Sequence, residues 1–515
     1  MSSPRPEHVR PRLLSDLGGP VGALLEGADR DVRGVSLSSA DIADGDLYAA
    51  LPGANAHGAS YAGDALAAGA VAVLTDAAGA RLLDEAGIAV PRLLVESPRS
   101  VVGRLAAHLY GTTDLPLRMV GITGTNGKTT TAYLVNSALV ALGHTTGLVG
   151  TVETRIGEER VTSVRTTPEA TVLHALLALM GERGVDTCVM EVSSHALAQH
   201  RVDGVVYDVA LFTNLSQDHL DFHPTMRDYF LAKASLFTPE RARRGIVCVD
   251  DEWGAELASL ASIPVVTVSS TDREATYRVE VDTADHSAFT VTGNGVALSL
   301  RSALPGDFNV VNTAMAALAL LGSGTDPDQV ESALAADPHV PGRMEPVQVE
   351  GREDLPLVVV DYAHTPDAVS AALQALRPAT TGRLVVVLGA GGDRDRGKRA
   401  AMGAAAAQHA DEVFVTDDNP RSEDPGTIRE TVLAGARESG GRAALHDVAG
   451  RAAAIRAAVG SAHAAGPGSV VAVVGKGHET GQEVAGTVHP FDDREEVRQA
   501  LEALPTHAAG EGSGQ

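Results

Sequence analysis

The pattern of apolar and polar positions divides most of the chain into short apolar runs that alternate with longer amphipathic stretches. From about residue 116, runs rich in β-branched residues are followed by Ala- and Leu-rich stretches of helical length, and a second series of the same kind begins near residue 355. Near-continuous apolar strands separated by helices are typical of parallel sheets whose two faces are both covered. The pattern therefore predicts two separate α/β domains in this part of the chain.

Shorter α/β units precede these two series, and turn-forming residues mark the boundaries. LYGTTDLPL (109–117) predicts a linker, and the Pro and Gly in HVPGRME (339–345) predict a second boundary. Residues 276–300 alternate with a period of two around an Asn-Gly pair, which predicts a hairpin at the edge of the middle domain. We expect an α/β protein with domains over 1–114, 115–340 and 341–505, and a disordered tail over 506–515.

Composition excludes several classes of protein. The chain has 515 residues, of which 44% are hydrophobic and 21% charged, so it is expected to fold as a globular protein. Its formal charge of −25 argues against a nucleic-acid-binding protein, which needs clustered Lys and Arg. Cys188 and Cys248 lie inside apolar runs and predict small core residues in a reducing compartment. No apolar run is long enough to insert into a membrane, and we expect a cytoplasmic monomer.

A glycine-rich turn joins a predicted strand to a predicted helix in LRMVGITGTNGKTTTAYLVNSAL. Glycines let backbone N–H groups approach phosphates, and a helix N-terminus adds positive potential. Lys128 can reach the β- and γ-phosphates of ATP, and Thr129 can bind Mg²⁺. The standard P-loop pattern requires Gly where this chain has Ile122. The turn predicts an ATP site with a shortened loop, and by itself it suits a motor, a switch or a kinase equally well.

Seven motifs, in order along nearly the whole chain, resemble the Mur ligases, which are ATP-dependent amide-forming enzymes of peptidoglycan precursor synthesis. The short loop GTNGKT is that family's own version of the phosphate loop. DNPR resembles the signature of those members that add diaminopimelate to UDP-N-acetylmuramoyl-L-alanyl-D-glutamate, whereas lysine-adding members have a different sequence there. The motifs are GTNGKTT, MEVSSHALAQHRVDG, FTNLSQDHLDFH, DYAHTPDA, GGDRDRGKR, DDNPRSEDP and GKGHET.

The resemblance implies a fold and a reaction. It implies an N-terminal α/β domain that binds the uridine nucleotide, a central P-loop ATPase-like domain with a parallel sheet, and a C-terminal Rossmann-like domain that binds the amino acid. The reaction uses ATP and Mg²⁺ to make an acyl phosphate, which the amine then attacks. The implied partners are therefore small molecules, namely the nucleotide dipeptide, diaminopimelate and ATP. Because both steps move charge on phosphoryl oxygens, Mg²⁺ and fixed cations should dominate catalysis.

Four residues are implied to be catalytic, namely Lys128, Glu191, His219 and Lys233, and Thr129 joins the last three at the Mg²⁺ site. Glu191 ends a predicted strand and His219 follows another, where open α/β sheets bind ligands. Without the resemblance, His219 would be a hydrogen-bonded histidine in a polar loop, and Lys233 a solvated lysine on a helix. The resemblance implies that Lys233 is carbamylated, which would turn a cation into an anion that helps to hold Mg²⁺.

Three further sets of residues are assigned to ligands by the resemblance. The ATP set is Gly124, Thr125, Asn126, Gly127, Lys128, Thr129, Thr130, Asn309, Arg343 and His364. The set for the nucleotide dipeptide is Leu37, Ser39, Thr166, Thr167, Ser193, Gln199 and Arg201. The diaminopimelate set is Arg394, Asp418, Asn419, Pro420, Arg421, Gly475 and Glu479. Ala40 and Arg165 depart from the family, whose members often have Arg and Asn at these positions.

Two alternatives are open at this point. Folylpolyglutamate synthase, from the same ligase superfamily, shares the short phosphate loop, but DNPR and GKGHE disfavour it. A nucleotide-gated switch or binding protein could keep the ATP site without ligating anything, but the presence of Glu191, His219 and Lys233 argues against a degenerate site. The sequence does not distinguish the meso from the LL isomer of diaminopimelate.

Overall fold

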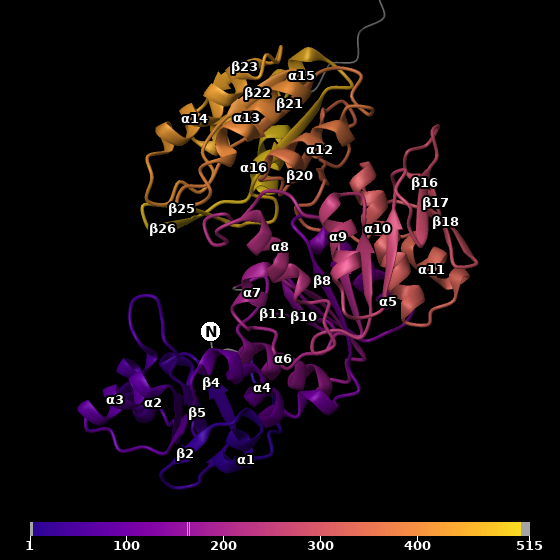
Figure 1. The fold of residues 1–515 in the computed structure, drawn as a ribbon. Coiled ribbons are helices and arrows are strands. Elements are labelled where there is room, and N and C mark those ends of the chain that lie inside the picture. The colour runs from indigo at the N-terminus through magenta and orange to yellow at the C-terminus, as the bar shows by residue number, and fades with distance from the viewer. Residues whose placement is uncertain (1–3, 162, 164, 506–515) are drawn as a thin grey trace, which may run out of the picture.

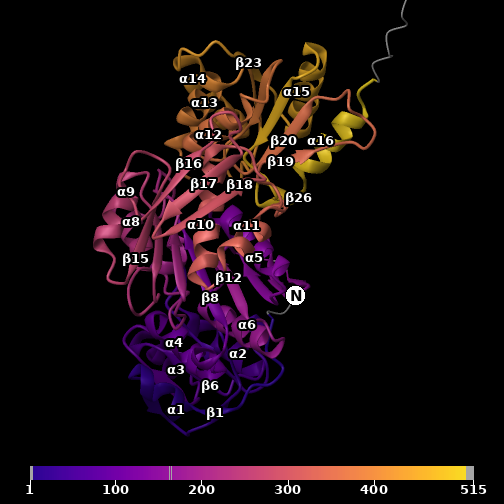
Figure 2. The same ribbon diagram turned by 90° about the vertical axis from the view of Figure 1, so that its right-hand side faces the viewer.

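The computed structural model describes residues 4–161, 163 and 165–505. Its three larger sheets, each built from one part of the chain, form three tiers, and two further sheets have two strands each, β1 with β3 and β25 with β26. The central domain lies between the N-terminal domain and the C-terminal domain in two perpendicular views (Figures 1 and 2). The predicted three-domain α/β architecture is confirmed, and the residue at which each domain ends stays a prediction. In the described ranges, no helix is long and apolar enough to cross a membrane. The tail predicted over 506–515 lies outside them.

The N-terminal domain contains a five-stranded sheet in the order β2-β7-β6-β5-β4, in which only β2 runs antiparallel to its neighbour. The linker predicted over 109–117 is wrong in its first two residues, since helix α4 extends to Tyr110. The helix continues this far because Leu109 is buried in the core of this domain. The elements are β1 Arg12–Leu13, α1 Leu14–Gly18, β2 Leu24–Glu26, β3 Asp31–Val32, β4 Gly34–Ser36, β5 Asp46–Ala49, α2 Ala62–Ala67, β6 Ala72–Thr75, α3 Ala77–Glu85, β7 Arg92–Leu94 and α4 Pro98–Tyr110.

The central domain contains an eleven-stranded sheet in the order β11-β10-β9-β12-β8-β13-β14-β15-β16-β17-β18, parallel from β9 to β16. Its elements are β8 Arg118–Thr123, α5 Lys128–Ala141, β9 Thr146–Val149, β10 Thr154–Ile156, β11 Glu159–Val161, α6 Ala170–Glu182, β12 Thr187–Glu191, α7 Ser194–Ala198, β13 Val209–Phe212, α8 Met226–Ala234, β14 Gly245–Cys248, α9 Glu252–Leu260, β15 Val265–Ser269, β16 Tyr277–Val281, β17 Ala288–Gly293, β18 Val296–Arg301, α10 Asp307–Gly322 and α11 Pro327–Leu334.

The hairpin predicted over 276–300 is confirmed as β17–β18, which extends the antiparallel edge that begins at β16. Asn294 and Gly295 have φ of +47° and +76°, as a tight turn between twisted strands requires.

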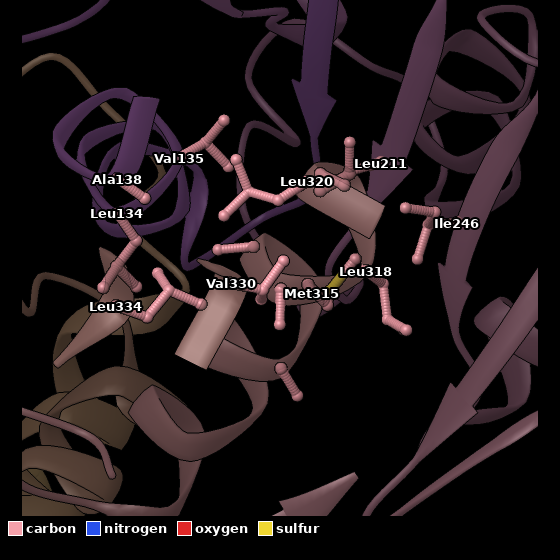
Figure 3. Close-up of a cluster of buried hydrophobic side chains, with 14 of the residues drawn as sticks. Leu134, Val135, Ala138, Leu211, Ile246, Met315, Leu318, Leu320, Val330 and Leu334 are labelled. Carbon is pink, nitrogen blue, oxygen red and sulfur yellow. The ribbon is translucent and has the colours of Figure 1, made fainter. Parts of the chain in front are cut away.

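Both faces of the central sheet are covered, as the apolar strands predict. Alternate residues of β8 pack on opposite sides: Val120 and Ile122 face α5, α10 and α11, whereas Met119 faces α6. Figure 3 shows the first of these cores, where α5, α10 and α11 meet side chains of the sheet such as Leu211. Cys188 and Cys248 are free thiols buried in the two cores, which confirms that they are core residues.

The C-terminal domain contains a six-stranded sheet in the order β19-β20-β24-β21-β22-β23, parallel except for β19, and a separate hairpin of β25 and β26. Its elements are β19 Glu345–Val347, β20 Leu357–Asp361, α12 Pro366–Leu376, β21 Leu384–Leu388, α13 Lys398–His409, β22 Glu412–Val415, α14 Pro425–Glu438, β23 Ala444–Asp447, α15 Arg451–Ala465, β24 Val470–Val474, β25 Gly481–Val484, β26 Thr487–Pro490 and α16 Asp493–Glu502.

The carboxyl ends of the central and C-terminal parallel strands share one cavity of about 450 Å³. Ser193 follows β12 of the central sheet, whereas Gly389 follows β21 and Gly475 follows β24 of the C-terminal sheet, and all three line this cavity. Ligands of open α/β sheets bind at this edge. The fold thus places the ligand-binding edges of two sheets opposite each other.

Candidate active site

The loop between β8 and α5 is shaped by two glycines. Gly124 and Gly127 have φ of +145° and +86°, and a Cβ atom on Gly124 would lie 1.9 Å from Oγ1 of Thr213. Only glycine fits so close to the neighbouring strand end. Ile122, the departure from the standard P-loop, lies in the buried interior of β8. The strand therefore continues through the position where other P-loops have already turned, which explains the short loop.

Lys128 folds back over this loop. Its Nζ donates to the carbonyl oxygens of Gly124 at 3.0 Å and Thr125 at 2.8 Å. Burial lowers the pKa of Lys128, and the nearby Glu191 partly offsets that effect. The ammonium group lies at the N-terminus of α5, where a helix binds anions. This arrangement fits the phosphate chain of a nucleotide.

Glu191 connects the phosphate loop to the central sheet. The buried carboxylate accepts hydrogen bonds from Oγ1 of Thr129 at 3.0 Å and from the backbone N–H of Thr151 at 2.8 Å. Thr129 also accepts one at 3.0 Å from Arg343, at the start of the C-terminal domain. Thr151 was missed by the sequence analysis because it lies in no recognisable motif.

The oxygen atoms of Thr129 and Glu191 suit Mg²⁺, which binds proteins through one or two carboxylates and completes its shell with phosphate oxygens and water. Among the described residues there is no group of three or more His, Cys, Asp or Glu side chains that could enclose a metal. The oxygen donors of Thr129 and Glu191 therefore fit a magnesium ion whose remaining ligands are phosphate oxygens and water.

Lys233 is not the solvated helix lysine that its sequence alone suggests. Its side chain is 1% exposed, and its Nζ donates to the carbonyl oxygen of Gly124 at 2.7 Å. The Nζ also lies 4.5 Å from the centre of the Tyr229 ring. Burial, with a further contribution from Lys128, lowers the pKa of Lys233 well below its ordinary value. A buried amine with a low pKa is therefore placed against the phosphate loop.

Asp218 joins the central and C-terminal domains. Its carboxylate lies 3.2 Å from Nζ of Lys398 and 3.4 Å from Nε2 of His364. Burial alone would raise the pKa of Asp218, but His364, His219 and Lys398 together lower it. His219 is the next residue, with φ of +57°, and burial lowers its pKa. The sequence analysis did not single out Asp218 or Lys398, because nothing in the sequence indicates that two residues 180 positions apart form a pair.

The shared cavity brings together residues assigned to two different ligands. From the central domain it is lined by Thr166, Thr167, Ser193 and Arg201, and from the C-terminal domain by Arg394, Asp418, Asn419, Arg421, Gly475 and Glu479. Gln199 supports this set by accepting a hydrogen bond from Arg201. Pro420 is buried beside the cavity without lining it. The exposed Arg165, one of the two departures from the family noted in the sequence, also lines it.

A second cavity, of about 410 Å³, adjoins the phosphate loop and is lined by Asn126, Gly127, Thr130, Arg343 and His364. Asn309 does not line it. Its Oδ1 accepts from Nδ2 of Asn312 at 3.1 Å, and Asn312 lies one turn further along α10 and does line the cavity.

Leu37 and Ser39 lie in the N-terminal domain, away from both cavities. Leu37 packs against the core of that domain, and Ser39 begins a short 3₁₀ helix, Ser39–Asp41. The structure therefore does not bring these two residues together with the rest of their predicted set.

Arg421 is held by the β25–β26 hairpin. Its backbone N–H donates to the carbonyl oxygen of Glu483 at 3.0 Å, and its side chain pairs with the Glu483 carboxylate at 3.3 Å. Its Nη1 donates to the carbonyl oxygen of Gly392 at 2.8 Å. These contacts fix the guanidinium group at the cavity wall, where it can bind a carboxylate.

Three family patterns match the chain. The Mur ligase middle domain matches residues 122–320, the Mur ligase glutamate ligase domain matches 342–477, and the Mur ligase family catalytic domain matches 31–110. The chain belongs to the Mur ligase family. The resemblance found in the sequence is thereby confirmed.

Relatives of this Mur ligase cover nearly its whole length. A Streptomyces avermitilis protein named "UDP-N-acetylmuramoyl-L-alanyl-D-glutamate--2,6-diaminopimelate ligase" is 52% identical, over 97% of this chain and 98% of the relative. A Leifsonia xyli subsp. xyli protein is 48% identical, over 97% of this chain and 98% of the relative. It is named "UDP-N-acetylmuramyl-tripeptide synthetase", a name that specifies no amino acid. A solved structure titled "Structure of UDP-N-acetylmuramoyl-L-alanyl-D-glutamate--2, 6-diaminopimelate ligase" superposes with a TM-score of 0.65 and is 31% identical in sequence. The match covers 96% of this chain and 99% of the chain in that structure.

Proposed function

We propose that this Mur ligase adds diaminopimelate to UDP-N-acetylmuramoyl-L-alanyl-D-glutamate with the energy of ATP. The observation that supports this most directly is the position of the DNPR loop. Asp418, Asn419 and Arg421 line the same cavity as Ser193 and Arg201, so an amino acid and a nucleotide-linked peptide can meet there. The Streptomyces avermitilis relative, 52% identical over nearly the whole chain, has a name that specifies this reaction.

The proposed reaction has two steps. A carboxylate oxygen of the nucleotide dipeptide attacks the γ-phosphorus of ATP, the bond to the β-phosphate oxygen breaks, and an acyl phosphate and ADP form. The amine of diaminopimelate then attacks the acyl carbon, inorganic phosphate leaves, and the new amide nitrogen loses its proton. Lys128 and the N-terminus of α5 bind phosphate oxygens, and Arg343 is positioned beside Thr129 to bind the same chain of phosphates.

Mg²⁺ would supply charge neutralisation at the phosphate oxygens when it is bound. Thr129 and Glu191 would hold it, and His219 and a carbamylated Lys233 complete the proposed set. A neutral amine is the form of lysine that reacts with CO₂, and the burial of Lys233 lowers its pKa and so favours that form. The carbamate would also remove a positive charge beside Lys128.

The remaining assignments are part of the same proposal. ATP occupies the cavity at the phosphate loop, and Thr166, Thr167, Ser193, Gln199 and Arg201 bind the nucleotide dipeptide, with Leu37 and Ser39 of the N-terminal domain at its uridine end. We expect a cytoplasmic enzyme, as the two free buried thiols suit a reducing compartment. We also expect a monomer, because one chain supplies residues to every part of the shared cavity.

Diaminopimelate should be strongly preferred to lysine. Arg421 and Arg394 at the cavity wall would bind the carboxylate at the far end of diaminopimelate, and lysine has no carboxylate there. A charged bidentate contact left unmade should reduce kcat/KM by about 10³-fold. The measurement is kcat/KM for each amino acid, with the product identified by mass. Comparable values for lysine and diaminopimelate would contradict the proposed specificity.

The matched variant for this test is Arg421→Ala. It should lose most of the discrimination between the two amino acids, because it removes the group that recognises the carboxylate. Activity with ATP and the nucleotide dipeptide up to the acyl phosphate should persist. A variant that still discriminates as the wild type does would place the carboxylate elsewhere.

A further inference from the structure

Lysine is rare in this chain and confined to the site. Of 41 basic residues, four are lysines, at positions 128, 233, 398 and 476, and the others are arginines. Lys128 and Lys233 donate to carbonyl oxygens of the phosphate loop, and Lys398 pairs with Asp218 in the cavity. An ammonium is a compact cation with three donors, whereas a guanidinium is planar and larger. All the remaining basic residues of this chain are arginines. The fourth lysine, Lys476, is therefore expected to lie where the geometry suits an ammonium group rather than a guanidinium group.

Lys476 lies beneath the amino-acid end of the shared cavity. It follows β24 by two residues, and its side chain is 0% exposed. Its Nζ donates to Oδ1 of Asn419 at 3.1 Å and to Oε2 of Glu479 at 3.1 Å, and it lies 3.9 Å from Oδ1 of Asp418. All three partners line the cavity and belong to the proposed diaminopimelate set. One buried ammonium therefore contacts three groups that face the ligand.

These contacts fix the orientation of the Asn419 amide. Its Oδ1 accepts from Nζ of Lys476 and from the backbone N–H of Glu483 at 2.9 Å. Its Nδ2 donates to Oε2 of Glu479 at 2.9 Å. Two donors at one end and a carboxylate at the other allow only this orientation. Both contacts of the Glu479 carboxylate use Oε2, which leaves Oε1 to accept from a ligand.

The charges of the cluster also suit an ammonium ligand. Asp418 and Glu479 contribute two negative charges at the cavity wall, and the buried Lys476 offsets one of them. The cluster keeps one surplus negative charge, which matches one ammonium group of a zwitterionic amino acid. Without the lysine, two like charges would face each other at the cavity wall.

We infer that Lys476 is a positioning residue for the amino-acid substrate, which sets Asp418, Asn419 and Glu479 in the geometry that binds its ammonium group. This inference rests on the proposed function, since it assigns a role within the diaminopimelate pocket. It adds a residue that touches no substrate and acts through three that do.

The test uses the full-length enzyme with Lys476→Met, which keeps the length of the side chain and removes its charge and donors. We expect the KM for diaminopimelate to rise about 10- to 100-fold, because three groups that bind it lose their common partner. The KM values for ATP and the nucleotide dipeptide should stay within about twofold, as should acyl-phosphate formation without diaminopimelate. Lys476→Arg, which keeps the charge in a larger shape, should recover only part of the affinity.

The control variant is Arg377→Met, which removes a cation of the same domain from an exposed pair with Asp411 at the other end of the sheet. Its three KM values should equal those of the wild type. An unchanged KM for diaminopimelate in Lys476→Met would overturn the inference, as would an equal rise in all three KM values with a lower melting temperature. If the wild-type enzyme itself does not join diaminopimelate, the proposed function fails and the inference fails with it.

Discussion

Replacing Lys128 with alanine should abolish amide formation while the nucleotide dipeptide still binds. The side chain reaches across the phosphate loop at the N-terminus of α5, and it does not line the cavity assigned to the other two substrates. Loss of one preorganised cation at the transferring phosphoryl group should reduce kcat by about 10³-fold or more. Calorimetry with the nucleotide dipeptide and a ligation assay with all three substrates measure the two effects separately.

Lys128→Arg is the matched control for this prediction. It keeps the positive charge, but the planar guanidinium cannot place its donors where the ammonium contacts the carbonyl oxygens of Gly124 and Thr125. We therefore expect it to be nearly as impaired as the alanine variant. Ligation by Lys128→Ala at close to the wild-type rate would show that the short loop is not the ATP site.

The sequence predicts the sheets and the phosphate loop well because their signals are local. Each apolar run that predicted a strand from residue 116 onward lies in a buried parallel strand, such as β8 and β24. The Asn-Gly pair at the edge of the middle domain lies in the turn that its backbone preference requires. The end of α4 was missed by two residues, because turn-forming residues indicate where a helix can stop and the packing of Leu109 decides where it does.

The candidate site is harder to predict from the sequence than the fold is, because its residues come from distant parts of the chain. Asp218 contacts His364 and Lys398, and no spacing in the sequence indicates either pair. Asn309 and Asn312 lie one turn apart on α10, and only the fold shows that Asn312 lines the cavity. For Lys398 and Lys476 a signal did exist, namely the rarity of lysine among 41 basic residues.

Lys233 shows how a local pattern can be informative and still be missed. It lies four residues after Tyr229 and three after Phe230, and all three side chains are on the buried face of α8. A charged residue at such a position is ordinarily assigned to solvent, because burying an unpaired charge is costly. The structure resolves the conflict by lowering the pKa of Lys233, so that the buried amine can be neutral.

Replacing Lys233 with alanine should remove most of the activity. If Lys233 is carbamylated, the variant loses an anion beside the phosphate loop, and we expect kcat to fall by about 10²-fold or more. An ordinary solvated lysine would be replaceable at little cost. Acetate or formate at high concentration should restore part of the activity by occupying the vacated space. Lys233→Arg is the control, because a guanidinium fills that space, cannot be carbamylated and should not respond to added carboxylate.

The carbamate itself can be observed directly, because the chain has only four lysines. With ¹³C-labelled bicarbonate, the wild-type enzyme should show one carbamate carbon resonance that is absent from Lys233→Arg. Carbamate formation consumes the neutral amine and releases a proton, so occupancy should rise with pH, and the lowered pKa of Lys233 should move that rise toward neutral pH. Activity should fall when CO₂ is removed and recover when bicarbonate is returned. Full activity of Lys233→Ala without any additive would refute the carbamate role.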